Sequence, residues 1–234
     1  MSSIKQISVI GRGGFGALTS SLIPDNIEHS SFGSKDTVDN IEAIGASDVI
    51  ILCIPLDAYP AVLDQLAPHL TPATLVVDVC SVKVTPSKLL AKHLPNHENV
   101  LLTHPLFGPD SWDNGQQHTL VVTNKLQGIA EEVIEFCDTT LGLRILHMSN
   151  EEHDKRMAEV HALTFFIARA LSKLDLQSEP FMTPSFQKLL DLVDLDGSQS
   201  EALFRTIENG NPFAAAERIK FLNGLNTIES SLQE

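Results

Sequence analysis

The glycine-rich stretch Gly11-Arg12-Gly13-Gly14-Phe15-Gly16 decides the fold class, because it directly follows the apolar run at residues 5–10 and leads into a helical pattern. Each glycine at this G-x-G-x-x-G spacing has a physical reason. Gly11 permits a tight turn, Gly13 lets the backbone approach a pyrophosphate, and Gly16 allows a helix to pack close to a strand. The following helix directs backbone N–H groups at the anion. The stretch therefore predicts a dinucleotide-binding loop, whose remaining residues are Arg12, Gly14 and Phe15.

The first two thirds of the chain alternate short β-branched runs with helical patterns, which is typical of βαβ units around a parallel sheet. Some runs are continuously apolar, such as residues 49–53, as expected of strands covered on both faces. We therefore expect an α/β fold with a Rossmann-type dinucleotide-binding domain over residues 1–149. The predicted strands are residues 5–10, 26–30, 48–53, 74–78, 99–103, 118–123 and 143–147. The predicted helices are residues 14–22, 58–66, 86–92 and 126–140.

From Asn150 onward the apolar residues recur at helical spacing. Asn150 suits a helix N-cap, and the acidic residues after it suit the positive end of the helix dipole. His153 and Asp154 are interpreted as first-turn residues, with the alternative that Asp154 fixes the tautomer of His153. We expect a smaller all-helical domain over residues 150–234, and a homodimer through it because so short a domain buries little core alone. Its later helices are predicted at residues 185–193, 199–209 and 212–232.

Composition excludes several classes of function. The formal net charge is −14 and the 16 Lys and Arg residues are scattered, which argues against a nucleic-acid partner. No apolar run approaches the roughly 20 residues of a membrane span, and the start lacks the features of a signal or transit peptide, so we expect a cytoplasmic protein. Cys53, Cys80 and Cys137 are widely spaced, which favours buried thiols over a disulfide or a metal site.

The end of the second predicted strand bears on the choice of dinucleotide. A site for NAD usually carries Asp or Glu there, about 20 residues after the glycine loop, to accept the ribose 2′-hydroxyl. Here the strand ends in Ser30 and Ser31, and Lys35 follows shortly after. Hydroxyls and a lysine accommodate a 2′-phosphate, so the sequence favours NADP. An ordinary polar turn, with Glu28 displaced by a shifted register, is the alternative and would leave NAD.

Two further turns follow neighbouring predicted strands. They read Asp78-Val79-Cys80-Ser81-Val82-Lys83 and Thr103-His104-Pro105-Leu106-Phe107-Gly108-Pro109. Both lie at the edge where ligands of open α/β sheets bind. With the glycine loop, they resemble the prephenate/arogenate dehydrogenases, in which an S-V-K turn and an H-P-M-F-G-P turn flank the nicotinamide. The resemblance is densest over residues 48–111, which implies a cofactor contact at Pro55, and its C-terminal part is similar to the plant-like arogenate dehydrogenases.

The resemblance implies the NAD(P)-dependent oxidative decarboxylation of a small anionic substrate, prephenate or arogenate, in tyrosine biosynthesis. It makes His104 the acceptor of the 4-hydroxyl proton and Ser81 a hydrogen-bond partner of the same hydroxyl. Imidazole accepts protons near neutrality, and a hydroxyl both donates and accepts. Lys83 is interpreted as a third substrate-binding residue. The alternatives are a solvated lysine at position 83 and a structural His-Pro turn at position 104.

The chain departs from this family at two positions. Many members carry a histidine and an arginine in the helical domain where this chain has Phe165 and Gln187. Two other interpretations therefore stay open. One is a β-hydroxyacid-type dehydrogenase using Lys155, and the other is a dinucleotide-binding regulatory protein without turnover. The remaining candidates for binding a substrate carboxylate, each with a structural role as the alternative, are Arg169, Arg205 and Arg218.

Overall fold

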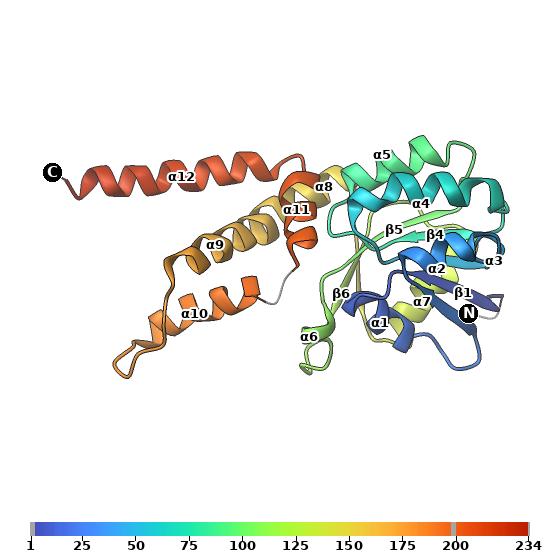
Figure 1. Cartoon of the computed structure of the whole chain (residues 1–234), viewed down its shortest axis with the longest axis horizontal. Coiled ribbons are helices and arrows are strands. Elements are labelled where there is room, and N and C mark those ends of the chain that lie inside the picture. Colours follow the sequence, from blue (N-terminus) through green and yellow to red (C-terminus); the bar gives the residue numbers. More distant parts are fainter. Residues whose placement is uncertain (1–2, 198–199, 234) are drawn as a thin grey trace. The chain divides into compact units, whose positions relative to one another are not determined.

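The computed structural model of the chain describes residues 3–197 and 200–233. The chain divides into two compact units, Met1–Glu151 and Glu152–Glu234, of which the first holds the β-sheet and the second is helical (Figure 1). Within the described residues, no helix combines the length and the apolar character that a membrane span requires.

The first unit is built on a sheet whose seven strands, among the described residues, run in the order β2-β1-β3-β4-β5-β6-β7. Strands β1 to β5 pair in parallel. The order reverses between β1 and β3, which makes their carboxyl ends the switch point where open α/β sheets bind ligands. All seven predicted strands are confirmed. They are β1 (Gln6–Ile10), β2 (Glu28–Phe32), β3 (Val49–Leu52), β4 (Leu75–Asp78), β5 (Val100–Pro105), β6 (Thr119–Val122) and β7 (Arg144–His147).

Strand β6 is an exception to the expected parallel arrangement. It runs antiparallel to β5, with His104 paired to Val121, whereas β7 is again parallel to β6. A parallel return needs a crossover that spans the sheet, usually a helix. Residues 106–118 form only the short helix α6 (Pro109–Trp112). The chain therefore turns back beside β5 instead of crossing over the sheet.

Helices α4 and α5 cover one face of the sheet, and α1 and α7 cover the other (Figure 1). The four predicted helices are confirmed as α1 (Gly14–Ser21), α4 (Tyr59–Leu66), α5 (Val84–His93) and α7 (Ile129–Thr139). Three short helices were not predicted, α2 (Ser34–Asp39), α3 (Ile41–Gly45) and α6. Each is shorter than the window over which a helical period can be recognised.

The core of this unit consists of two apolar layers, one on each face of the sheet. Val49 and Leu75 point into the layer that contains Ile134 of α7. Ile50 and Val76 point into the layer that contains Leu63 of α4. This alternation explains why β3 and β4 are almost continuously apolar, since both of their faces are covered.

The three cysteines are all thiols. Cys80 is buried, whereas Cys53 and Cys137 are half-buried. Burial raises the pKa of Cys53 to about 11 and that of Cys137 to about 12. All three lie in the first unit, and at neutral pH the thiols of Cys53 and Cys137 stay protonated.

The second unit is built from helices alone. Helix α8 (Asn150–Met157) continues through a π-helical turn, η3 (Ala158–Ala162), into α9 (Leu163–Leu171). Phe165, Ile207 and Ala214 form its small core. The predicted start at Gln199 lies outside the described residues, and the Oγ of Ser200 caps the helix that follows by accepting the N–H of Leu203 (3.1 Å). The remaining helices match the predictions as α10 (Pro184–Gly197), α11 (Glu201–Gly210) and α12 (Ala214–Ser231).

Candidate active site

The carboxyl ends of the parallel strands lie at one edge of the sheet. The register aligns Ile10 with Leu52, Leu52 with Asp78, and Asp78 with Leu102. The segments that follow these four residues therefore begin side by side. The sequence-predicted residues that share this edge are the glycine loop, Pro55, Ser81, Lys83 and His104.

The geometry of the glycine loop fits a dinucleotide pyrophosphate. Gly11 has φ +119°, and a Cβ on it would lie 2.0 Å from the carbonyl oxygen of Cys53. A Cβ on Gly16 would lie 2.0 Å from the carbonyl oxygen of Gly11. By contrast, nothing lies within 4 Å of a Cβ added to Gly13, the N-cap of α1. The first turn of α1 holds no acidic side chain that would repel an anion from its N–H groups.

Arg12 ties the glycine loop to the end of β2. Its Nε and Nη2 donate to the carbonyl oxygen of Ser31 (3.1 and 2.8 Å), and its Nη1 forms an ion pair with Asp36. The Oγ of Ser31 lies 2.6 Å from that of Ser20. Ser30 and Lys35 are exposed. Ser30, Ser31 and Lys35, which were expected near the ribose 2′ position, thus lie around the end of β2 together with Arg12 of the glycine loop.

Two expectations about this turn were wrong. Strand β2 extends to Phe32, so Ser30 and Ser31 lie within the strand and do not end it. The turn also contains a carboxylate, because Asp36 accepts the N–H of Gly33 (3.4 Å) in the first turn of α2. The sequence spacing indicates this carboxylate, because Asp36 stands about 20 residues after the glycine loop, where the acidic residue of an NAD site is expected. The strand was placed too early for that spacing to be applied.

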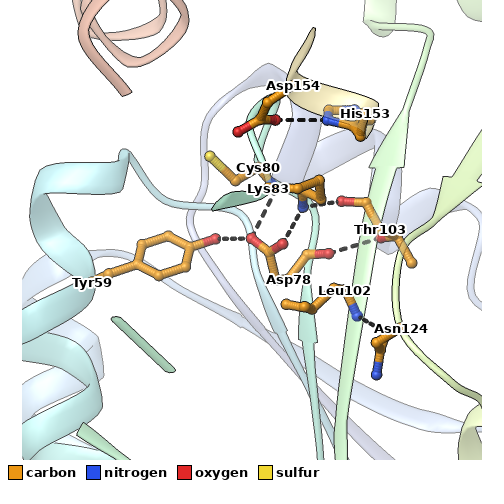
Figure 2. Close-up of polar contacts among 9 residues, drawn as sticks. All are labelled: Tyr59, Asp78, Cys80, Lys83, Leu102, Thr103, Asn124, His153 and Asp154. Carbon is orange, nitrogen blue, oxygen red and sulfur yellow. Dashed lines mark hydrogen bonds and ion pairs between the residues drawn. The ribbon is translucent and has the colours of Figure 1, made fainter. Parts of the chain in front are cut away.

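Lys83 is completely buried, so its interpretation as a solvated lysine was wrong. Its Nζ donates to the Asp78 carboxylate and to the carbonyl oxygen of Thr103 (Figure 2). His104, the next residue along β5, has only 4% of its surface exposed. Ser81 is half-buried in the turn between β4 and α5. The ammonium of Lys83 therefore links the turn that carries Ser81 to the strand end that carries His104.

Asp78 is the centre of this polar cluster, and sequence reasoning missed it. Its Oδ1 accepts the Tyr59 hydroxyl (2.6 Å) and the N–H of Cys80 (3.1 Å), while its carbonyl oxygen accepts the Thr103 hydroxyl (2.8 Å; Figure 2). Burial, together with the charge of Asp78, raises the pKa of Tyr59 well above its usual value. Tyr59 therefore remains a hydrogen-bond donor. The sequence signal was a carboxylate at the end of a strand that is otherwise apolar.

The turn after β5 reaches the glycine loop. The rings of Phe15 and Phe107 are 6.2 Å apart, and a Cβ on Gly14 would lie 3.2 Å from Cγ of Pro109. Trp112 lies 5.1 Å from Phe107, which extends this aromatic contact. The glycine loop and the turn after β5, both identified in the sequence, are thus in direct contact.

In the second unit, the candidate arginines are engaged by carboxylates. Arg169 donates to Asp196 (2.5 Å) and Glu201 (2.7 Å). Glu201 also accepts Arg205 (2.9 Å). Arg218 pairs with Glu208. These contacts support the structural role that was the alternative for each arginine.

Two histidines of this unit, His153 and His161, are held by neighbouring side chains. His153 and Asp154 are fully buried, with Nδ1 of His153 2.7 Å from the Asp154 carboxylate (Figure 2). Asp154 thus contacts the imidazole of His153, as required by the alternative interpretation in which it fixes the tautomer of that ring. Burial, and then the charge of His153, lowers the pKa of His161 to about 4. The ring of His161 packs edge-on against Phe165, with ring centroids 4.8 Å apart. Gln187, the other position at which the chain departs from the family, donates to Asp191 (3.0 Å).

Comparison with known proteins relates the chain to one group of enzymes. Residues 24–124 match the family model described as the prephenate dehydrogenase nucleotide-binding domain. Arogenate dehydrogenase 2 of Arabidopsis thaliana is 33% identical over 99% of this chain and 71% of its own length. Arogenate dehydrogenase 1 of the same plant is 30% identical over 97% of this chain. This chain spans only 39% of that second relative.

A solved structure shares the fold. Prephenate dehydrogenase from A. aeolicus, in complex with hydroxyphenyl propionate and NAD+, aligns with a TM-score of 0.74. The alignment covers 98% of this chain and 91% of that one, at 19% sequence identity. It extends the likeness to the glycine loop, which precedes the residues matched by the family model.

We predict that Gly13→Ala and Gly11→Ala have opposite consequences. A methyl at Gly13 meets no protein atom, so the melting temperature should stay unchanged while dinucleotide affinity falls at least about tenfold through lost pyrophosphate contact. A methyl at Gly11 meets the Cys53 carbonyl at a positive φ, so this variant should melt at lower temperature. Gly224→Ala, also in open space, is the control for affinity. Thermal unfolding and calorimetric titration check both. Unchanged affinity in Gly13→Ala contradicts the assignment of the loop.

Proposed function

Because this chain belongs to the prephenate/arogenate dehydrogenase family, we propose that it catalyses the NAD(P)-dependent oxidative decarboxylation of prephenate or arogenate in tyrosine biosynthesis. The observation that carries this proposal is the shared edge of the sheet. The glycine loop and the Ser81 turn follow strands that end there, and His104 lies within the last residues of β5 at the same edge. A dinucleotide on the loop and a small ring beside β4 and β5 would then be neighbours.

The chemistry needs a hydride acceptor, a proton acceptor and an exit for carbon dioxide. A bound nicotinamide supplies the hydride acceptor. His104 accepts the proton of the 4-hydroxyl as hydride leaves ring carbon 4, and loss of carbon dioxide then leaves an aromatic ring. Ser81 accepts or donates a hydrogen bond at the same hydroxyl and so fixes its direction.

The surroundings of His104 support its role as the base. It is 4% exposed and belongs to β5, which pairs on both sides, so the ring is held on a rigid element. Imidazole titrates near neutrality, and in its neutral form it takes a proton without prior activation. Exclusion of water keeps the proton on the acceptor while hydride departs.

We predict that His104→Asn lowers turnover by roughly 10²–10⁴, the usual effect of removing a general base. Dinucleotide affinity should barely change, because the glycine loop is untouched. Ser81→Ala should lower turnover less, since it removes only one hydrogen bond. The rise of wild-type activity with pH, as the imidazole loses its proton, should be absent in His104→Asn. Steady-state kinetics across pH test this, and near wild-type turnover in His104→Asn refutes the mechanism.

The cofactor proposal is NADP in preference to NAD. Arg12 and Lys35 supply two cations at the turn after β2, and the carboxylate there, Asp36, is already paired with Arg12. A 2′-phosphate entering the turn would therefore meet positive charge. The competing arrangement is NAD, with Asp36 accepting the ribose 2′-hydroxyl.

We predict that wild-type protein binds NADP more tightly than NAD, and that Lys35→Glu erases or reverses this preference by replacing a cation with an anion. Lys88→Glu makes the same change of charge at an exposed position of α5 and should leave the preference intact. Fluorescence titration of the three proteins with both dinucleotides measures the six affinities. Equal affinities of the wild type for NADP and NAD would overturn the assignment.

A second copy of the chain is the proposed partner. Helix α12 exposes a series of apolar side chains at helical spacing, including Leu225 (47% exposed) and Ile228 (59% exposed). A contiguous apolar surface of this kind usually marks an interface. The same series also contains Ile219, Leu222 and Leu232.

We predict a homodimer through residues 150–234 at micromolar concentration. Ile228→Glu should give a monomer, because it places a charge in the apolar series, whereas Thr227→Glu beside it should not. Light scattering coupled to size exclusion measures the mass of the wild type and of the two variants. A monomeric wild type counts against the proposal.

A further inference from the structure

We infer that Asp78 and Lys83 are a positioning pair, which holds the turn carrying Ser81 against the strand end carrying His104, and that Lys83 does not bind substrate. This inference rests on the proposed function. It departs from the sequence interpretation of Lys83 and gives a role to Asp78, which had none.

The pair joins two segments that are far apart in the sequence. Lys83 lies two residues after Ser81 and donates both to Asp78, at the end of β4, and to the carbonyl oxygen of Thr103. The Thr103 hydroxyl donates in return to the carbonyl oxygen of Asp78 (2.8 Å). These three contacts close the turn on itself and fasten it to the residue that precedes His104.

Asp78 is itself held from three directions. Besides Lys83, the Tyr59 hydroxyl and the Cys80 N–H donate to its carboxylate. Both members of the ion pair are fully buried. The Asp78 carboxylate thus accepts from three donors, and the Lys83 ammonium donates to two acceptors.

A buried ion pair is weak evidence for stability, because apolar residues of the same size often stabilise a fold as well. Here the ion pair matters because it fixes where the turn lies. Two oppositely charged groups with fixed hydrogen bonds define one position for the turn, whereas apolar side chains tolerate several. A displacement of about 1 Å between reacting groups can lower a rate by about 10²-fold. Ser81 and His104 are the groups whose separation this pair sets.

The test separates positioning from substrate binding by kinetics. In Lys83→Met, which keeps the length of the side chain, kcat should fall by about 10- to 100-fold while KM and dinucleotide affinity stay within about threefold of wild type. Loss of a cation that binds an anionic substrate would instead raise KM and preserve kcat. That second result overturns the inference.

A double variant separates positioning from folding. Asp78→Asn combined with Lys83→Met removes both charges and leaves an oxygen to accept Tyr59 and Cys80, so its melting temperature should exceed that of Lys83→Met alone. Its kcat should remain low, because the link to Thr103 is still missing. Recovery of full kcat together with stability would show that the pair serves the fold only. Ser8→Ala, which breaks the buried contact with Ser47 (2.8 Å), is the control for a destabilised sheet.

Hydrogen exchange provides a readout that needs no turnover. The amide of Cys80 donates to Asp78, so its exchange in the ligand-free protein should quicken in Lys83→Met and not in Ser8→Ala. Unchanged exchange at Cys80 with unchanged kcat overturns the inference. If the wild type oxidises neither prephenate nor arogenate, the proposed function fails, and quickened exchange still establishes that the pair orders the turn.

Discussion

The parallel register of β1, β3, β4 and β5 is the constraint on which the rest of the first unit depends. It aligns the last residues of these strands, so that chain segments separated by up to about 90 residues begin side by side at one edge. The register is held because both faces of the sheet are covered, and a slip of one residue would exchange the two apolar layers. Everything proposed for binding and chemistry follows from that alignment. The Asp78–Lys83 pair extends the same order one turn beyond the strands.

Features set by local patterns were predictable from the sequence. The run at residues 49–53 is apolar throughout because β3 is covered on both faces. Gly11 and Gly16 were recognised by their spacing, and their backbones do approach other chain atoms too closely for a side chain. Ser81 and His104 could be placed at one edge because the strands that carry them there were visible in the sequence, although β5 runs through His104 to Pro105. The fold class and the family resemblance needed no more than these elements.

Features set by partners distant in the sequence could not be predicted. The role of Asp78 depends on Tyr59, which comes from α4 and is 19 residues away. Lys83 sits in a position that suits a solvated lysine, and only the fold shows that it is buried. Asp36 was missed because strand β2 runs two residues further than its pattern indicates. Likewise, the arginines of the second unit meet their carboxylates across different helices, as Arg169 does with Asp196.

We propose that this chain oxidises a cyclohexadienol with a nicotinamide dinucleotide. The most direct measurement incubates the purified chain with NADP or NAD and with prephenate or arogenate, and follows absorbance at ~340 nm, where the reduced nicotinamide absorbs, together with release of carbon dioxide. We expect reduced dinucleotide and carbon dioxide in equal amounts, with a 4-hydroxyphenyl product, for at least one of the two substrates. A chain that binds dinucleotide and yet reduces none with either substrate would contradict it, and would favour a dinucleotide-binding regulatory protein.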